Sequence, residues 1–110
     1  MTKPKENKQK AQPFSKFEIE LFGDCFEKWG DTSQLMMLIE ECSELIQSVS
    51  KDLYRNDPVR PLKERLDHFA EEMADVQLMI DEFTWRYSLE KEVNSWRLKK
   101  ERSLYDKLNL

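Results

Sequence analysis

Glycine and cysteine are scarce in this sequence, histidine occurs once, and no long apolar run is present. With two glycines, 36% charged and 39% apolar residues, the composition favours long helices with a narrow buried stripe. Cys25 and Cys42 are too few for a disulfide framework and lack the spacing of a metal site, and Cys42 is expected to be a buried thiol. The longest apolar run, Leu35 to Ile39, is far short of a membrane span. No signal peptide is visible, so we expect a single soluble, cytoplasmic domain with no membrane partner.

The charge balance also restricts the possible ligands. A net charge of −4 argues against a stable nucleic-acid complex, because binding to a phosphate backbone needs a basic surface. It leaves room for a small phosphorylated ligand that is held through a metal ion.

Capping and breaking residues divide the chain into helices. Residues 1–13 are rich in Lys, Gln and Pro and are expected to be a disordered tail, which leaves 14–110 as the domain. The capping box Ser15-Lys16-Phe17-Glu18 predicts a first helix to about Trp29, and Gly30 is a natural C-terminal cap. Further helices are expected to about residue 54, over 62–86 after a loop marked by two prolines, and from about 88 onwards. The predicted fold class is all-α.

Five carboxylates in two short clusters carry the functional argument. Glu40, Glu41 and Glu44 form the first cluster, and Glu72 and Asp75 follow after 27 intervening residues. Spacings of three and four residues place side chains on one helix face. Two such helices packed antiparallel would bring Glu41, Glu44, Glu72 and Asp75 together. Four like charges at close range need protons or cations, and an all-oxygen site suits Mg²⁺ or Mn²⁺.

The apolar periodicity predicts which helix faces are buried. The second helix is expected to bury Leu35, Leu38, Ile39, Cys42, Leu45, Ile46 and Val49, with Glu41 and Glu44 at the edge. The third is expected to bury Leu66, Phe69, Met73, Val76, Ile80 and Phe83, with Met79 at the margin. Glu72 lies inside this second arc. A carboxylate directed into a core is costly unless it is paired or metal-bound, which indicates a site.

The last helix supplies positive charge. Its expected apolar stripe is Leu89, Val93, Trp96 and Leu104, and Arg97 and Lys100 lie in or beside it. These cations can neutralise the carboxylates in a structural network or bind the phosphates of a ligand. Alternatively, they extend past their apolar neighbours to water.

The two acidic clusters and the residues around them resemble the MazG-like nucleotide pyrophosphohydrolases, whose hallmark is EExxE followed by ExxD. The segments that carry the resemblance are Trp29-Gly30, Gln34, Leu38 to Ile46 and Glu71 to Val76. The resemblance implies a four-helix MazG-like bundle, assembled as a homodimer or homotetramer, that cleaves nucleoside triphosphates to monophosphate and pyrophosphate with Mg²⁺. Glu41, Glu44, Glu72 and Asp75 would be metal ligands. Glu40 would orient water, so that the catalytic set is Glu40, Glu41, Glu44 and Glu72.

The resemblance also suggests substrate contacts. Trp29 and Gln34 could stack on and hydrogen-bond a base, although Trp29 could instead pack in the core. The sequence Arg97-Leu98-Lys99-Lys100 stands where short family members often carry a basic Lys-Leu-x-Arg-like pattern, which implies phosphate contacts from Arg97 and Lys100.

Three other protein classes share some of these sequence features. A di-iron bundle needs two Glu-x-x-His units, and the only histidine, His68, is expected to face solvent with a structural or neutral role. A coiled-coil adaptor requires sustained heptads, whereas this chain is interrupted at Gly30, Pro58 and Pro61. A non-catalytic metal-binding or regulatory bundle remains the main alternative to an enzyme.

Overall fold

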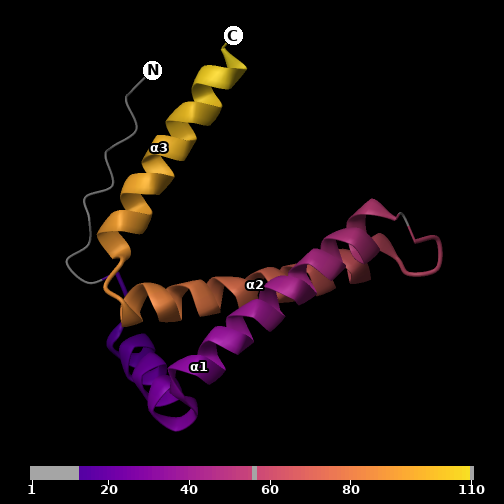
Figure 1. The fold of residues 1–110 in the computed structure, drawn as a ribbon. Coiled ribbons are helices and arrows are strands. Elements are labelled where there is room, and N and C mark those ends of the chain that lie inside the picture. The colour runs from indigo at the N-terminus through magenta and orange to yellow at the C-terminus, as the bar shows by residue number, and fades with distance from the viewer. Residues whose placement is uncertain (1–12, 56, 110) are drawn as a thin grey trace.

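The computed structural model describes residues 13–55 and 57–109, and these residues form an all-helical structure. Its elements are α1 (Lys16–Ser48), the π-helix η1 (Val49–Tyr54), α2 (Leu62–Arg86) and α3 (Glu90–Leu108). Figure 1 shows α2 lying along the second part of α1, and the loop between them reverses the chain. The predicted all-α class is confirmed. Residues 1–12 of the predicted tail lie outside the described part of the chain.

The start of α1 is set by the predicted capping box. The Ser15 hydroxyl accepts a hydrogen bond from the Glu18 backbone N–H at 3.1 Å, and the Glu18 carboxylate accepts one from the Ser15 N–H at 2.9 Å. Two backbone donors that have no partner within the helix are therefore satisfied.

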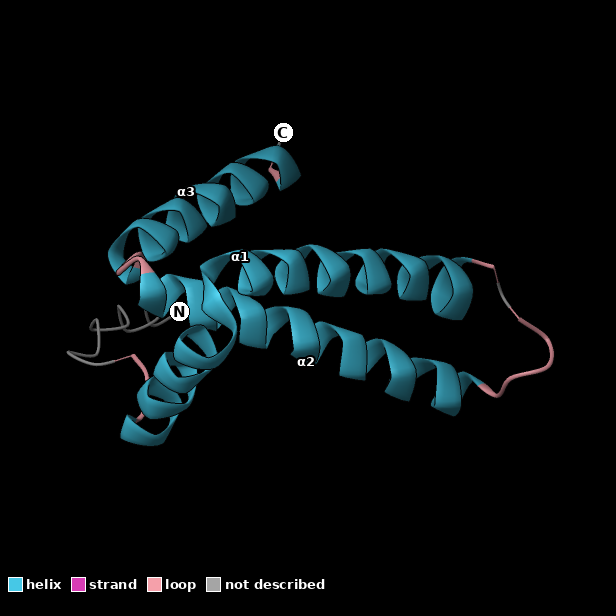
Figure 2. Cartoon of the chain, turned by 60° about the horizontal axis from the view of Figure 1, so that its bottom comes forward, coloured by secondary structure: helices cyan, strands magenta, loops and turns pink. Residues whose placement is uncertain are grey.

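Gly30 kinks α1 but does not end it. Its backbone has φ 81° and ψ 161°, a conformation that is essentially restricted to glycine, while α1 continues to Ser48. The non-helical Gly30 thus separates α1 into two helical arms, at the position where the sequence predicted the first helix to end. Figure 2 shows the bend, after which the second arm of α1 runs beside α2.

Replacing Gly30 is expected to destabilise the protein through its backbone alone. No atom lies within 4 Å of a Cβ built at Gly30, so Gly30→Ala introduces no clash. The strained φ/ψ should lower the free energy of unfolding by about 1–3 kcal/mol in urea denaturation. Gly23→Ala is the matched control, because its Cβ would make an ordinary 3.6 Å contact with Trp85 in a regular helix. That change should leave stability equal or higher. Equal losses in both variants would contradict the assignment of strain to Gly30.

The main apolar core lies where the first arm of α1 crosses the C-terminal half of α2. Phe26 packs edge-to-face against Phe83, with 5.3 Å between the ring centroids, and Met79 completes the cluster. Trp85 lies against it. This core holds the bent α1 onto α2.

The two antiparallel arms bury different faces from those predicted. Along the second arm of α1, the buried or half-buried residues include Gln34, Leu38, Glu41, Leu45 and Ser48. This face is rotated by about one residue, ~100°, from the centre of the predicted stripe. The central predicted residues Leu35, Ile39, Ile46 and Val49 are exposed, and Cys42 is half-buried. The predicted burial is therefore wrong for these four residues in a single chain, whereas Leu38, Cys42 and Leu45 of the same stripe are half-buried.

On α2, the predicted face is shifted in the same way. Val76, Met79 and Phe83 are buried, and Phe69 is half-buried. However, Leu66, Met73 and Ile80 of the expected stripe are exposed. Glu72 lies at the centre of the buried face and is 7% exposed, which confirms its predicted burial. The polar edges of both stripes thus meet each other, and much of the apolar surface faces outward.

Helix α3 does not join the bundle. Within the described residues it contacts α2 but neither α1 nor η1. The Ser88 backbone, with φ 53°, ends α2 and redirects the chain, and the Leu89 N–H donates to the Thr84 carbonyl across this turn. No residue of α3 is buried, so the predicted burial of Leu89, Val93, Trp96 and Leu104 is wrong for one chain. The described chain therefore does not form the predicted four-helix bundle by itself.

Among the helices of residues 13–55 and 57–109, none combines the length and apolar character needed to cross a membrane.

Candidate metal centre

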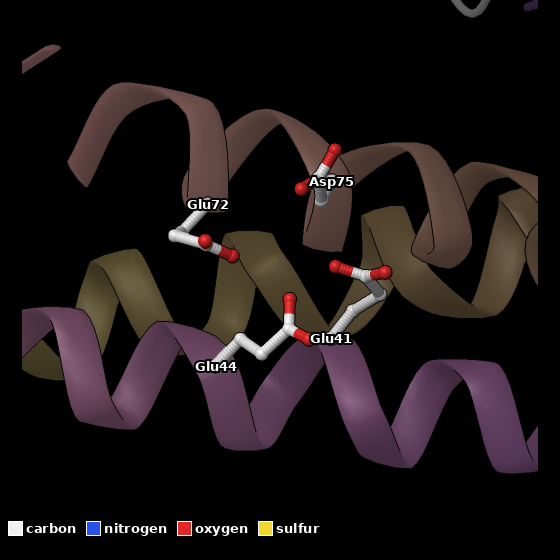
Figure 3. Close-up of side chains that lie close together, drawn as sticks. All are labelled: Glu41, Glu44, Glu72 and Asp75. Atoms are coloured by element: carbon white, nitrogen blue, oxygen red, sulfur yellow. The ribbon is translucent and has the colours of Figure 1, made fainter. Parts of the chain in front are cut away.

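Four carboxylates converge between the two antiparallel arms. Glu41 and Glu44 come from α1, Glu72 and Asp75 come from α2, and one oxygen from each lies within 4.8 Å of all the others. Figure 3 shows Glu44 and Glu72 directed toward each other, with Glu41 and Asp75 beside them. The structure thus brings together the four residues that the sequence proposed as metal ligands. The packing buries Glu72, half-buries Glu41 and Asp75, and leaves Glu44 exposed.

Two oxygens of this cluster lack the partners that buried carboxylates normally have. Glu41 Oε2 and Glu72 Oε2 are both buried and neither has a hydrogen-bond partner. A buried charged oxygen without a partner costs free energy, so most such oxygens in proteins are paired or bind a cation. The cluster therefore combines excess negative charge with unused ligand capacity.

The electrostatics of the cluster favour protonation when no cation is present. Burial, followed by repulsion from Glu44, Asp75 and Glu72, raises the pKa of Glu41 to about 7. Burial also raises the pKa of Glu72 above its usual value, and the neighbouring Glu44 adds to this effect. A divalent cation would relieve both causes, because it supplies the positive charge that the protein does not.

The stability of the metal-free protein should fall as pH rises. Folded Glu41, with a pKa of about 7, holds a proton that the unfolded chain releases above the ordinary glutamate pKa of 4.5. The stabilisation is complete below pH 4.5 and is lost as pH increases through 7. In EDTA, the melting temperature should therefore decrease between pH 5.5 and 8. The pKa values of Glu72, Glu82 and His68 are also raised, so these groups also make the melting temperature fall as pH rises. The difference in this pH dependence between the wild type and Glu41→Gln therefore gives the contribution of Glu41. Equal slopes in the two proteins would contradict this role.

Glu40 does not share in the cluster. It is exposed on α1, one residue before Glu41, and is not among the four converging carboxylates. Adjacent helical residues point about 100° apart, so an arm that buries Glu41 turns Glu40 outward. In one chain, the expected water-orienting position of Glu40 is not formed.

The residues expected to contact substrate lie in different environments. Gln34 is 4% exposed and lies two turns before Glu41 on the same face of α1. Trp29 is half-exposed beside the kink, with Lys28 Nζ 5.3 Å from its ring centroid, so its alternative placement in the core is wrong. Arg97 and Lys100 lie on the outlying α3, where Arg97 pairs with Glu101 at 3.1 Å. The structure of one chain brings neither cation to the carboxylates.

A network of polar side chains adjoins the centre and includes residues that the sequence analysis did not identify. Asp52, in η1, is fully buried, and its Oδ2 accepts hydrogen bonds from the Ser48 hydroxyl at 2.5 Å and from His68 Nδ1 at 2.6 Å. Arg60 Nη2 lies 2.8 Å from Asp52 Oδ1, and buried Arg65 donates to the Asp52 carbonyl at 2.6 Å. The hydrogen bonds from His68 and Ser48 lower the pKa of Asp52 to about 2.

His68 connects this network to the carboxylate cluster. Its Nε2 lies 3.3 Å from Glu72 Oε1, although the ring remains 47% exposed. The expectation of a solvent-facing histidine is thus only half correct. The signal available in the sequence was the i,i+4 spacing of His68 and Glu72, which places both on one face of α2. No comparable signal linked either residue to Asp52, because that contact depends on the π-turn and on the return of the loop.

Comparisons of this chain with protein-family models, with curated proteins and with solved structures give no match.

Proposed function

We propose that this protein hydrolyses nucleoside triphosphates to nucleoside monophosphates and pyrophosphate with the help of Mg²⁺. The observation that carries the proposal is the convergence of Glu41, Glu44, Glu72 and Asp75, with two buried oxygens that have no protein partner. The resemblance of the two acidic motifs to the MazG-like family supplies the reaction class. The role would be control of nucleotide pools or removal of non-standard nucleotides.

The donor set is suited to a hard divalent cation. All four donors are carboxylate oxygens, which Mg²⁺ and Mn²⁺ prefer over softer ligands. The span of 4.8 Å slightly exceeds the ~4.2 Å between opposite ligands of a single Mg²⁺, so a small side-chain rotation or a second ion would accommodate the cluster. Four carboxylates carry more negative charge than one divalent ion, which is compatible with more than one.

The chemistry requires charge neutralisation and a directed water molecule. Glu41, Glu44, Glu72 and Asp75 would hold Mg²⁺, which when bound would supply positive charge against the negative charge that develops during phosphoryl transfer. The water oxygen forms a new bond to phosphorus, the bridge between the α- and β-phosphates breaks, and a carboxylate of the cluster accepts the water proton.

Assembly of several copies is part of the proposal. The outward apolar stripes of α1 and α2, together with the entirely unburied α3, expose more apolar surface than a monomer of this size usually does. A homodimer or homotetramer would cover these faces. It would also allow Arg97 and Lys100 of one copy to reach phosphates bound at the carboxylates of another.

The experiment that tests the function measures pyrophosphate release from a panel of common and modified (d)NTPs, with Mg²⁺, with Mn²⁺ and with EDTA. Metal-dependent release from at least one nucleotide is the expected result, and it would rank the bases at the same time. No release across the panel from a folded protein that binds Mn²⁺ would replace the enzyme by a metal-binding regulatory bundle.

A further inference from the structure

We propose that His68 is a positioning residue, which buried Asp52 holds in place so that it orients Glu72 for metal binding. This inference rests on the proposed metal centre but not on nucleotide hydrolysis. Asp52 and Ser48 are at most 1% exposed, and they lie at the junction of α1 and η1. The π-helix η1 lengthens α1 by six residues before the loop and places Asp52 opposite His68 of α2.

The histidine ring is held at both ends. Its Nδ1 donates to Asp52 Oδ2 at 2.6 Å, and its Nε2 lies 3.3 Å from Glu72 Oε1. Asp52 is itself fixed by the Ser48 hydroxyl at 2.5 Å and by Arg60 at 2.8 Å, so it cannot easily rotate away from the ring. A rigid group therefore contacts one oxygen of Glu72.

The second oxygen of Glu72 is left for a ligand. Oε2 is buried and has no hydrogen-bond partner, whereas Oε1 faces His68. An interaction that restrains Oε1 restricts the carboxylate to orientations in which Oε2 faces the cluster. Mutation of a residue that contacts a metal ligand, but not the metal itself, typically weakens metal binding by about 10–100-fold.

Two substitutions separate the two contacts of the ring. The amide of His68→Asn reaches the position of Nδ1 and can still bond Asp52, but it cannot reach Glu72. The longer His68→Gln places its amide near the position of Nε2 and can still contact Glu72. The full chain would be titrated with Mn²⁺ alone, with free Mn²⁺ followed by electron paramagnetic resonance, and thermal melting would be recorded in EDTA.

If His68 positions Glu72, His68→Asn should weaken Mn²⁺ binding by about tenfold or more, and His68→Gln should fall between it and the wild type. If His68 only ties the hairpin together, the order is reversed: His68→Asn keeps the melting temperature and the Mn²⁺ affinity, and His68→Gln loses stability. Lys63→Gln, which removes an exposed positive charge from the same helix, is the control and should bind Mn²⁺ within twofold of the wild type.

A His68→Asn protein that binds Mn²⁺ as tightly as the wild type would overturn the inference, as would a wild type that binds none. Failure of the proposed function alone is distinguishable, because the protein would then bind Mn²⁺ in a His68-dependent way and release no pyrophosphate.

Discussion

Glu72→Gln is expected to abolish metal-dependent hydrolysis and to raise the thermal stability of the metal-free protein at the same time. Glutamine has nearly the same shape as glutamate, but it carries no charge and is a poor ligand for Mg²⁺. Loss of a direct ligand should reduce turnover by at least ~100-fold, because partners outside the ligand shell already contribute 10–100-fold. Mn²⁺ should raise the melting temperature of the wild type, because it binds only the folded protein, but it should no longer do so in Glu72→Gln.

The gain in stability has a separate cause. Glu72 is buried, has one oxygen without a partner and faces Glu44 across the interface, so its charge opposes folding when no cation is present. Removing that charge should raise the melting temperature in EDTA above that of the wild type, even though the contact with His68 changes. If the Glu72 side chain served only to stabilise the fold, Glu72→Gln would instead lower the melting temperature in EDTA.

The neighbouring Glu71 provides the matched control. It is exposed, precedes Glu72 by one residue and lies outside the converging cluster. Glu71→Gln should therefore keep its hydrolysis and its response to Mn²⁺ within about threefold of the wild type. Full activity in Glu72→Gln, with helix content unchanged by circular dichroism, would remove the proposed metal centre.

Charged substitutions in the outward stripe of α1 should break the assembly. Ile39 and Ile46 are 66% and 70% exposed in the single chain and belong to the stripe that the periodicity predicts to be buried. Burying an isoleucine in an interface is worth about 1.5–3 kcal/mol, and in a two-fold interface each residue counts twice. Ile46→Glu should therefore shift the protein from an oligomer to a monomer in sedimentation velocity at micromolar concentration.

The control for this experiment is Gln47→Glu. Gln47 is the next residue on α1 and is also exposed, so the substitution adds the same charge without removing an apolar contact. It should leave the oligomer intact. If the wild type sediments as a monomer, the exposed stripe is not covered by a second copy, and the proposed contribution of Arg97 and Lys100 to a neighbouring site would be withdrawn.

The sequence was sufficient to predict where the main helices lie and which four carboxylates converge. The capping box at Ser15, the break at Gly30 and the predicted span 62–86 all reappear in the structure, because caps, glycine conformation and proline exclusion act over a few neighbouring residues. Spacings of three and four selected Glu41, Glu44, Glu72 and Asp75 for the same local reason.

Only the tertiary structure decided how the helices rotate against each other and what surrounds the carboxylates. Apolar periodicity alone would bury Ile39 and Ile46, but the arms instead turn their polar edges together, so that Glu72 is buried, Glu41 and Asp75 are half-buried and Glu44 stays exposed. The Asp52–His68–Glu72 connection requires a π-turn and a chain reversal, which join residues distant in sequence. Local propensity carries no information about such contacts, because they depend on packing between elements that the chain brings together only when it folds.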